Sequence, residues 1–150
     1  MIFLDNDRLL EKMDELEKYL RELDEYLPAE EKDYLNSGLI KRACERAFQL
    51  ASENLLDICN LIISEKGFGI PTDSKDSVRK LAENGIIPGS LSARLEELVG
   101  FRNLLVHQYG HVDDSRAYYY LNEESKDFYE FIEIIDKFIG LETGISHEKT

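Results

Sequence analysis

The segment from Arg102 to His111, RNLLVHQYGH, holds an arginine, two histidines and a tyrosine within ten residues and contains no acidic residue. The acid-free window extends from Leu98 to Val112, although the chain has 31 acidic and 18 basic residues. Histidine can take up and return a proton near neutral pH, and arginine offers a permanently charged fork that suits phosphate oxygens. We therefore expect a locally positive or neutral surface that can act on a phosphate group.

The chemistry open to Arg102 and His107, without a cage of carboxylates for a metal, is metal-independent cleavage of RNA. The 2′-hydroxyl would attack the adjacent phosphorus, His107 would shuttle protons, and Arg102 would stabilise charge on the phosphate. On an ideal helix these two residues lie roughly 140° apart, whereas Asn103 and His107, at i and i+4, share one stripe. Either the last turn loosens before Gly110, or Arg102 reaches around, or a second copy completes the site. A two-fold dimer would gather two arginines and two histidines along one seam.

The same residues allow plainer interpretations. Arg102 could form a surface salt bridge, and His107 could be a histidine that favours the dipole at a helix C-terminus. His107, His111 and Asp113 could also share a metal ion, because two histidines at i and i+4 on one helix face the same way. However, Gly110 lies between the histidines and should end the helix, so we predict no metal site and no cofactor.

The elements that must position this segment are helices. Apolar residues recur at helical spacing nearly throughout, and the chain has only 3 prolines. We expect an all-α, up-down bundle of four main helices and one short helix, forming a single domain over residues 1–150 with a frayed tail at about 141–150 that contains His147. The first predicted helix ends at 27, and the second starts between 32 and 39 and ends at about 66. The short helix spans 72–74 to 84. The last two run from about 92 to 109 and from 113 or 114 to about 140.

Composition restricts the class of protein further. A formal charge of −13 disfavours broad, sequence-blind binding of nucleic acid, which relies on many phosphate contacts. The two cysteines, Cys44 and Cys59, fall in one predicted helix about 22 Å apart, which is beyond disulfide reach. We expect reduced core cysteines in a cytoplasmic protein without a membrane span.

The octapeptide RNLLVHQY, read as R-x4-H-x-Y with Asn103 after the arginine, resembles the signature of the HEPN superfamily and of its HepT-like toxin branch. The segments AFQLASENLLDI and LAENGIIPGSLSARLEELVGFRNLLVHQYG resemble the family's second helix and its approach to the catalytic helix. The resemblance covers roughly residues 40 to 140, and the signature positions show no departure. The first helix and the tail match only in general character.

This resemblance implies a homodimeric endoribonuclease, the toxin of a type VII-like toxin–antitoxin pair that cuts tRNA or mRNA. Arg102 and His107 would be catalytic. The antitoxin would be a small MNT-type nucleotidyltransferase that silences the toxin by AMPylation of Tyr109. An alternative within the same fold is a partner and modification target with little cleavage of its own, and a third interpretation is a purely structural helical adaptor.

Other residues near the signature are assigned supporting or structural roles. Asn103 is a candidate supporting residue. Glu53 and Asp57, at i and i+4 on an otherwise apolar helix, are either solvated or turned toward the basic cluster, and we favour Asp57 as the one that turns. The three consecutive tyrosines at 118–120 are interpreted as structural, in contrast to Tyr109.

Overall fold

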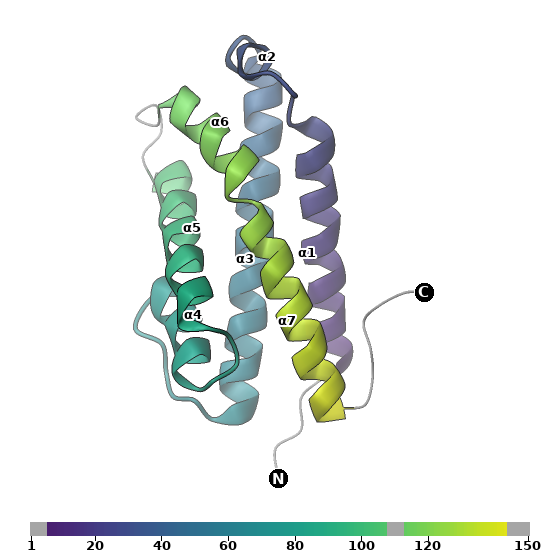
Figure 1. The fold of residues 1–150 in the computed structure, drawn as a ribbon, viewed down its shortest axis with the longest axis vertical. Helices are drawn as coiled ribbons and strands as arrows, with labels where there is room; N and C mark the ends of the chain where they lie inside the picture. The colour runs from purple at the N-terminus through teal and green to yellow at the C-terminus, as the bar shows by residue number, and fades with distance from the viewer. Residues whose placement is uncertain (1–5, 108–112, 144–150) are drawn as a thin grey trace.

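The computed structural model describes residues 6–107 and 113–143, and every regular element within them is a helix. The all-α prediction is therefore confirmed. The helices are α1 (Asn6–Tyr26), α2 (Glu31–Leu35), α3 (Gly38–Lys66), α4 (Ser74–Glu83), α5 (Gly89–His107), α6 (Asp114–Glu123) and α7 (Lys126–Thr143). In Figure 1, α1, α3, α5 and α7 run along the long axis of the molecule, as an up-down bundle requires.

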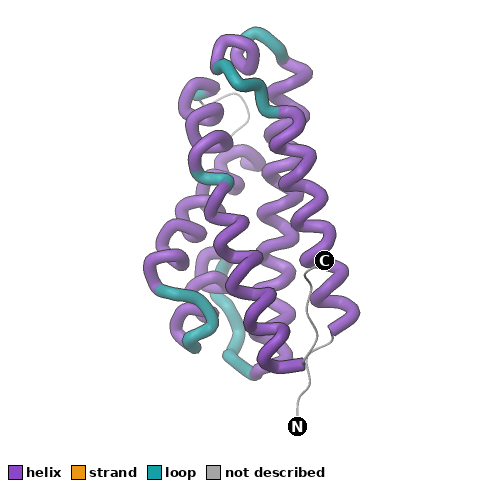
Figure 2. The backbone as a smooth tube through the Cα atoms, turned by 45° about the vertical axis from the view of Figure 1, so that its right-hand side comes forward, coloured by secondary structure: helices purple, strands orange, loops and turns teal. Residues whose placement is uncertain are grey.

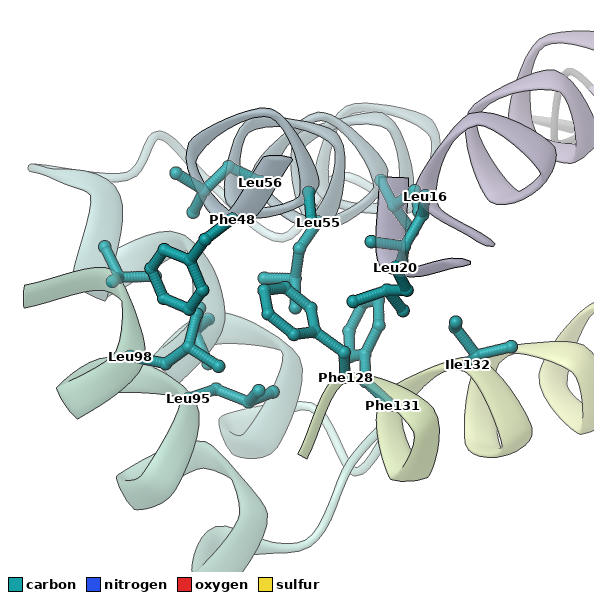
Figure 3. Close-up of a cluster of buried hydrophobic side chains, with 14 of the residues drawn as sticks. Leu16, Leu20, Phe48, Leu55, Leu56, Leu95, Leu98, Phe128, Phe131 and Ile132 are labelled. Atoms are coloured by element: carbon teal, nitrogen blue, oxygen red, sulfur yellow. The ribbon is translucent and has the colours of Figure 1, made fainter. Parts of the chain in front are cut away.

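The core lies where the long helices meet. In α1 the apolar residues that recur at steps of four and three positions are buried, and they pack this helix against α3 at Leu9, Met13, Leu16, Leu20 and Leu23. Side chains of α1, α3, α5 and α7 converge in the interior, as Figure 3 shows for Leu16, Phe48, Leu95 and Phe128. Because α3 packs against α1, α4 and α5, its wide apolar face is explained by neighbours on more than one side.

The start of α3 was ambiguous in the sequence because of the segment NSG at positions 36–38. The structure resolves it into two helices, since α2 ends at Leu35 and α3 begins at Gly38. The Ser37 side chain accepts a hydrogen bond from the Ile40 amide at 3.1 Å, which caps α3. As the tube in Figure 2 shows, α2 is a short helix at one end of the bundle.

The last predicted helix is two helices rather than one. The Asp113 side chain caps α6 by accepting from the Ser115 amide at 2.9 Å, as predicted, but α6 stops at Glu123 and α7 begins at Lys126. The apolar residues that recur at helical spacing are nevertheless buried in both pieces, at Tyr118, Leu121, Phe128, Ile132, Ile135 and Ile139. Moreover, α7 continues to Thr143, past the predicted start of the tail.

The junction between α6 and α7 is held by Asp127, whose carboxylate is only 1% exposed. Arg94 of α5 donates to Asp127 at 2.5 Å and to Glu130 at 2.8 Å. A carboxylate in this position costs free energy unless it is paired, so the ion pair with Arg94 ties the start of α7 to α5.

Arg94→Ala should therefore lower the free energy of unfolding by about 2 kcal/mol. This loss is smaller than the usual loss for a fully buried ion pair, because the Arg94 side chain is 41% exposed. The matched control is Lys137→Ala, which breaks an exposed pair with Glu133 and should cost less than about 0.5 kcal/mol. Urea unfolding of both variants measures the difference. Equal losses would contradict the role assigned to Arg94.

Cys44 and Cys59 are both buried in α3 and are free thiols, as predicted. Burial raises the pKa of the Cys44 thiol to about 11, so it remains protonated and unreactive near neutral pH. Within the part of the chain that the structure describes, no helix is long and apolar enough to cross a membrane.

Candidate functional site

Arg102 and His107 of the signature lie on α5, and the core face of this helix determines the direction of the Arg102 side chain. The helix begins at Gly89, three residues before the predicted start, and buries Leu91, Leu95, Leu98 and Val99. Arg102 follows Leu98 at i+4 and Val99 at i+3, so its side chain leaves the helix on the same side as the core residues. As a result the guanidinium is mostly covered, and the side chain is 19% exposed.

The Arg102 guanidinium is held by two acceptors from two helices. Its Nη2 donates to Glu53 Oε1 on α3 at 3.2 Å, and its Nη1 donates to Oδ1 of the neighbouring Asn103 at 2.9 Å. Two acceptors on different nitrogens restrict rotation of the planar fork, so its direction is set before any ligand arrives. Asn103 thus contacts Arg102, and its supporting role in the site stays a prediction.

Glu53 and Asp57 point to different neighbours, and our preference for Asp57 was wrong. Asp57 Oδ2 lies 3.1 Å from Nζ of Lys12 on α1, while Glu53 reaches Arg102 on α5. The hydrogen bond to Asp57 raises the pKa of the Lys12 amine. The step of four residues from Glu53 to Asp57 rotates the side chain by about 40° around the helix axis, which is enough to move it from the α5 side of α3 to the α1 side.

His107 is the last residue of α5. Its side chain, together with Tyr109, His111 and His147, lies outside the described part of the chain. Three statements therefore remain predictions: that His107 and Arg102 converge, that His107 and His111 could share a metal ion, and that Tyr109 is accessible.

Two of the three consecutive tyrosines are packed as predicted. The Tyr118 hydroxyl donates to the Pro28 carbonyl at 2.7 Å, and the Tyr120 ring stacks on Phe101 with centroids 4.5 Å apart. Tyr119 differs, because it is 61% exposed on α6.

A groove of about 620 Å³ lies on a different side of α5 from Arg102. On this helix it is lined by Glu97, Gly100, Phe101 and Leu104, and Lys75 and Arg116 come from α4 and α6. Arg102 is roughly 140° around the helix from Glu97. The Arg102 site is therefore part of the surface between α3 and α5, separate from this groove.

Comparison with known proteins decides the family. A family model described as ribonuclease HepT-like matches residues 16–135, which is most of the chain. The chain belongs to the HepT-like ribonuclease family. The match begins within α1, further toward the N-terminus than the resemblance at residues 40 to 140 implied, and it includes the whole signature.

Two curated proteins are similar to this chain in sequence. The mRNA nuclease HepT of Shewanella oneidensis is 36% identical over 87 residues, which cover 58% of this chain and 65% of that protein. A putative RNase of Archaeoglobus fulgidus is 27% identical over 136 residues, 89% of this chain and 97% of that protein. The alignment with the first relative thus spans just under two thirds of its length.

Solved structures share the HepT-like fold. A tri-AMPylated HEPN toxin of Shewanella oneidensis in complex with its MNT antitoxin has a TM-score of 0.80 and 25% identity, covering 86% of this chain and 96% of that one. YutE of Bacillus subtilis, a cytosolic protein of unknown function, has a TM-score of 0.83 and 21% identity over 99% of this chain and 100% of that one. At that lower identity YutE supports the fold alone.

Proposed function

We propose that this HepT-like protein is an endoribonuclease toxin that cleaves mRNA or tRNA at a site built from Arg102 and His107. The observation that carries the proposal is the R-x4-H-x-Y signature, whose arginine is already oriented on α5 by Glu53 and Asn103. Family membership and the relative named an mRNA nuclease support RNA as the substrate.

The proposed reaction needs no metal. The 2′-oxygen bonds to the adjacent phosphorus while its proton passes to neutral His107, and the bond from phosphorus to the 5′-oxygen breaks. A protonated His107 of a second copy gives the leaving 5′-oxygen a proton, so the products are a 2′,3′-cyclic phosphate and a 5′-hydroxyl. Arg102 donates to the phosphate oxygens as their charge increases.

A homodimer is part of this proposal. Arg102 and His107 lie roughly 140° apart on an ideal helix, so one straight helix does not direct both side chains to the same phosphate. Two copies related by a two-fold axis would bring an arginine from one to a histidine of the other. Sedimentation analysis of the purified protein should then show a dimer.

The decisive experiment is incubation of the purified protein with RNA in excess chelator. Cleavage products ending in a 2′,3′-cyclic phosphate are expected, and a 2′-deoxy substitution at the cut site should prevent cleavage, because the nucleophile is then absent. Cleavage that requires an added divalent cation, or products with a 5′-phosphate, would contradict the mechanism.

The proposed partner is an MNT-type nucleotidyltransferase that AMPylates Tyr109 in a cytoplasmic toxin–antitoxin pair. Support comes from the Shewanella toxin, which was solved tri-AMPylated and bound to its MNT antitoxin. Tyr109 is the only tyrosine in the acid-free window, where an added phosphate meets no carboxylate repulsion from neighbours in sequence.

A second candidate function is favoured by the ion pair of Arg102. Because Glu53 already neutralises the guanidinium at 3.2 Å, the arginine has less attraction for a phosphate than a free one. In that case the protein would be chiefly the binding partner and modification target of the nucleotidyltransferase.

Glu53→Gln separates these two functions. If Glu53 orients a working Arg102, the amide oxygen of glutamine still accepts a hydrogen bond, and the cleavage rate should stay within about threefold of the wild type. If the carboxylate masks the arginine, the rate should rise at least about tenfold, equivalent to about 1.4 kcal/mol. Asp57→Asn, which removes a charge one turn away toward Lys12, is the matched control.

A further inference from the structure

The exposed side of α3 next to Arg102 carries a row of charged residues. Arg42, Arg46 and Glu53 lie within about 40° of one another around the helix axis, and both arginines are exposed. Glu53 joins this row to α5 through its contact with Arg102. The arginines and the proposed catalytic residue therefore belong to one continuous surface, which we call the α3 row and define as Arg42, Arg46 and Glu53.

Positive charge on this surface is only partly compensated. Glu45 lies between the two arginines on α3; burial raises the pKa of its carboxyl, and the nearby charges of Lys41 and Arg42 lower it. Glu53 is paired with Arg102, and the next acid along α3, Asp57, is paired with Lys12. Among the residues that the structure describes, neither Arg42 nor Arg46 has an ion-pair partner. In a chain with a formal charge of −13, Arg42 and Arg46 thus place positive charge on a local part of the surface, which favours anions there.

The α3 row extends toward the end of α5 that carries His107. Asp114, at the start of α6, contacts Lys41 near the start of α3 at 3.0 Å, so the starts of α6 and α3 lie side by side. Figure 1 shows the two helices running in opposite directions. From Glu53 to Arg46 the helix rises about 10 Å, and from Arg102 to His107 about 7.5 Å, so Arg46 lies near the level of His107 along the bundle.

We propose that Arg42 and Arg46 bind the sugar–phosphate backbone of the RNA on one side of the cleavage site. The proposal rests on the proposed function, because it places these arginines beside the Arg102 site on the same substrate. Arginine forms bidentate hydrogen bonds with phosphate, and contacts of this kind position a strand without reading its sequence. An acidic protein thereby binds RNA through a short cationic surface instead of a generally basic one.

The test is binding of a 2′-O-methyl RNA oligonucleotide, which the proposed mechanism cannot cleave, measured by fluorescence anisotropy at several salt concentrations. For single strands the slope of log K against log salt is about −0.7 per phosphate contact. Arg42→Ala with Arg46→Ala should therefore flatten the slope by about 1.4, and at about 0.1 M salt weaken binding about 25-fold. The matched control is Lys32→Ala with Lys137→Ala, which removes two exposed lysines that are already ion-paired.

The two proposals fail separately in this design. Unchanged affinity and slope in the arginine variant would overturn the assignment of the α3 row while leaving cleavage by Arg102 and His107 untouched. The converse result is a wild-type protein that binds RNA through Arg42 and Arg46 and never cleaves it. That result would overturn the proposed nuclease activity and support the assignment of RNA binding to the α3 row.

The rival occupant of the α3 row is a second copy of the chain, because Leu39, 79% exposed, precedes Arg42 by one turn. Sedimentation of the arginine variant without RNA distinguishes this case. An unchanged sedimentation coefficient supports the RNA surface, whereas dissociation into monomers would overturn it and assign the row to contact between copies.

Discussion

Replacing Arg102 or His107 by alanine is expected to lower the rate of RNA cleavage at least about a hundredfold. Loss of a preorganised donor to charge developing in the transition state typically costs about 10²- to 10³-fold, and loss of a general acid–base group about 10²- to 10⁴-fold. Single-turnover cleavage of a labelled RNA in excess chelator measures both variants. Because the two groups act in one step, the double variant should lose little more than the worse single variant.

Arg102→Lys provides a sharper test of the arginine. Lysine keeps the positive charge but cannot bridge Glu53, Asn103 and a phosphate with one planar fork, so most of the activity should still be lost. Urea unfolding must accompany these assays, since Arg102 also contacts α3. Cleavage at the wild-type rate by folded Arg102→Ala and His107→Ala proteins would contradict the proposed site and indicate a contaminating nuclease.

Local patterns were sufficient to predict most of the fold. The stripe from Leu9 to Leu23 is buried as the four- and three-residue steps indicate, because an apolar stripe that wide has to face another helix. Asp73, within the predicted start at 72–74, caps α4 with a side-chain oxygen, and aspartate is a residue type that favours this position. Such signals are carried by residues a few positions apart, so the sequence reveals them directly.

The break between α6 and α7 depends instead on distant residues. Neither glycine nor proline marks positions 124–125, and the apolar stripe continues across them. What stabilises the start of α7 is Arg94, 33 positions before Asp127 in the sequence. A contact over that distance in the chain leaves no periodic signal, which is why a single helix was predicted.

In the candidate site, too, some features follow from nearby residues in the sequence and others depend on distant ones. The presence of Arg102 on a helix, with Asn103 beside it, follows from the spacing of the signature. The choice between Glu53 and Asp57 depended on which neighbour, α5 or α1, occupies each side of α3, and a helical period does not identify neighbours. That Arg42 and Arg46 form no ion pair with a described residue likewise became visible only in the structure.

The second large effect is expected at Tyr109. Expressed together with the proposed nucleotidyltransferase, the protein should gain the mass of one or more AMP units on this tyrosine. The phenol oxygen would bond to the α-phosphorus of ATP, pyrophosphate would leave, and the phenol proton would pass to a base of the transferase. The nucleotide adds bulk and negative charge within the acid-free window, so RNA phosphates should be repelled and cleavage should fall at least about a hundredfold, roughly 3 kcal/mol.

Tyr109→Phe isolates this effect, because phenylalanine keeps the ring and lacks the oxygen that accepts AMP. Its cleavage should persist in the presence of the transferase, and its growth inhibition should no longer be relieved by co-expression. Tyr119→Phe is the matched control, since Tyr119 is an exposed tyrosine ten positions away on α6, and this variant should still be modified and silenced. Intact mass and peptide mapping measure the modification. AMP on Tyr119, or silencing of the Tyr109→Phe protein, would show that the transferase acts through another residue, because no other phenol in the signature remains to receive the nucleotide.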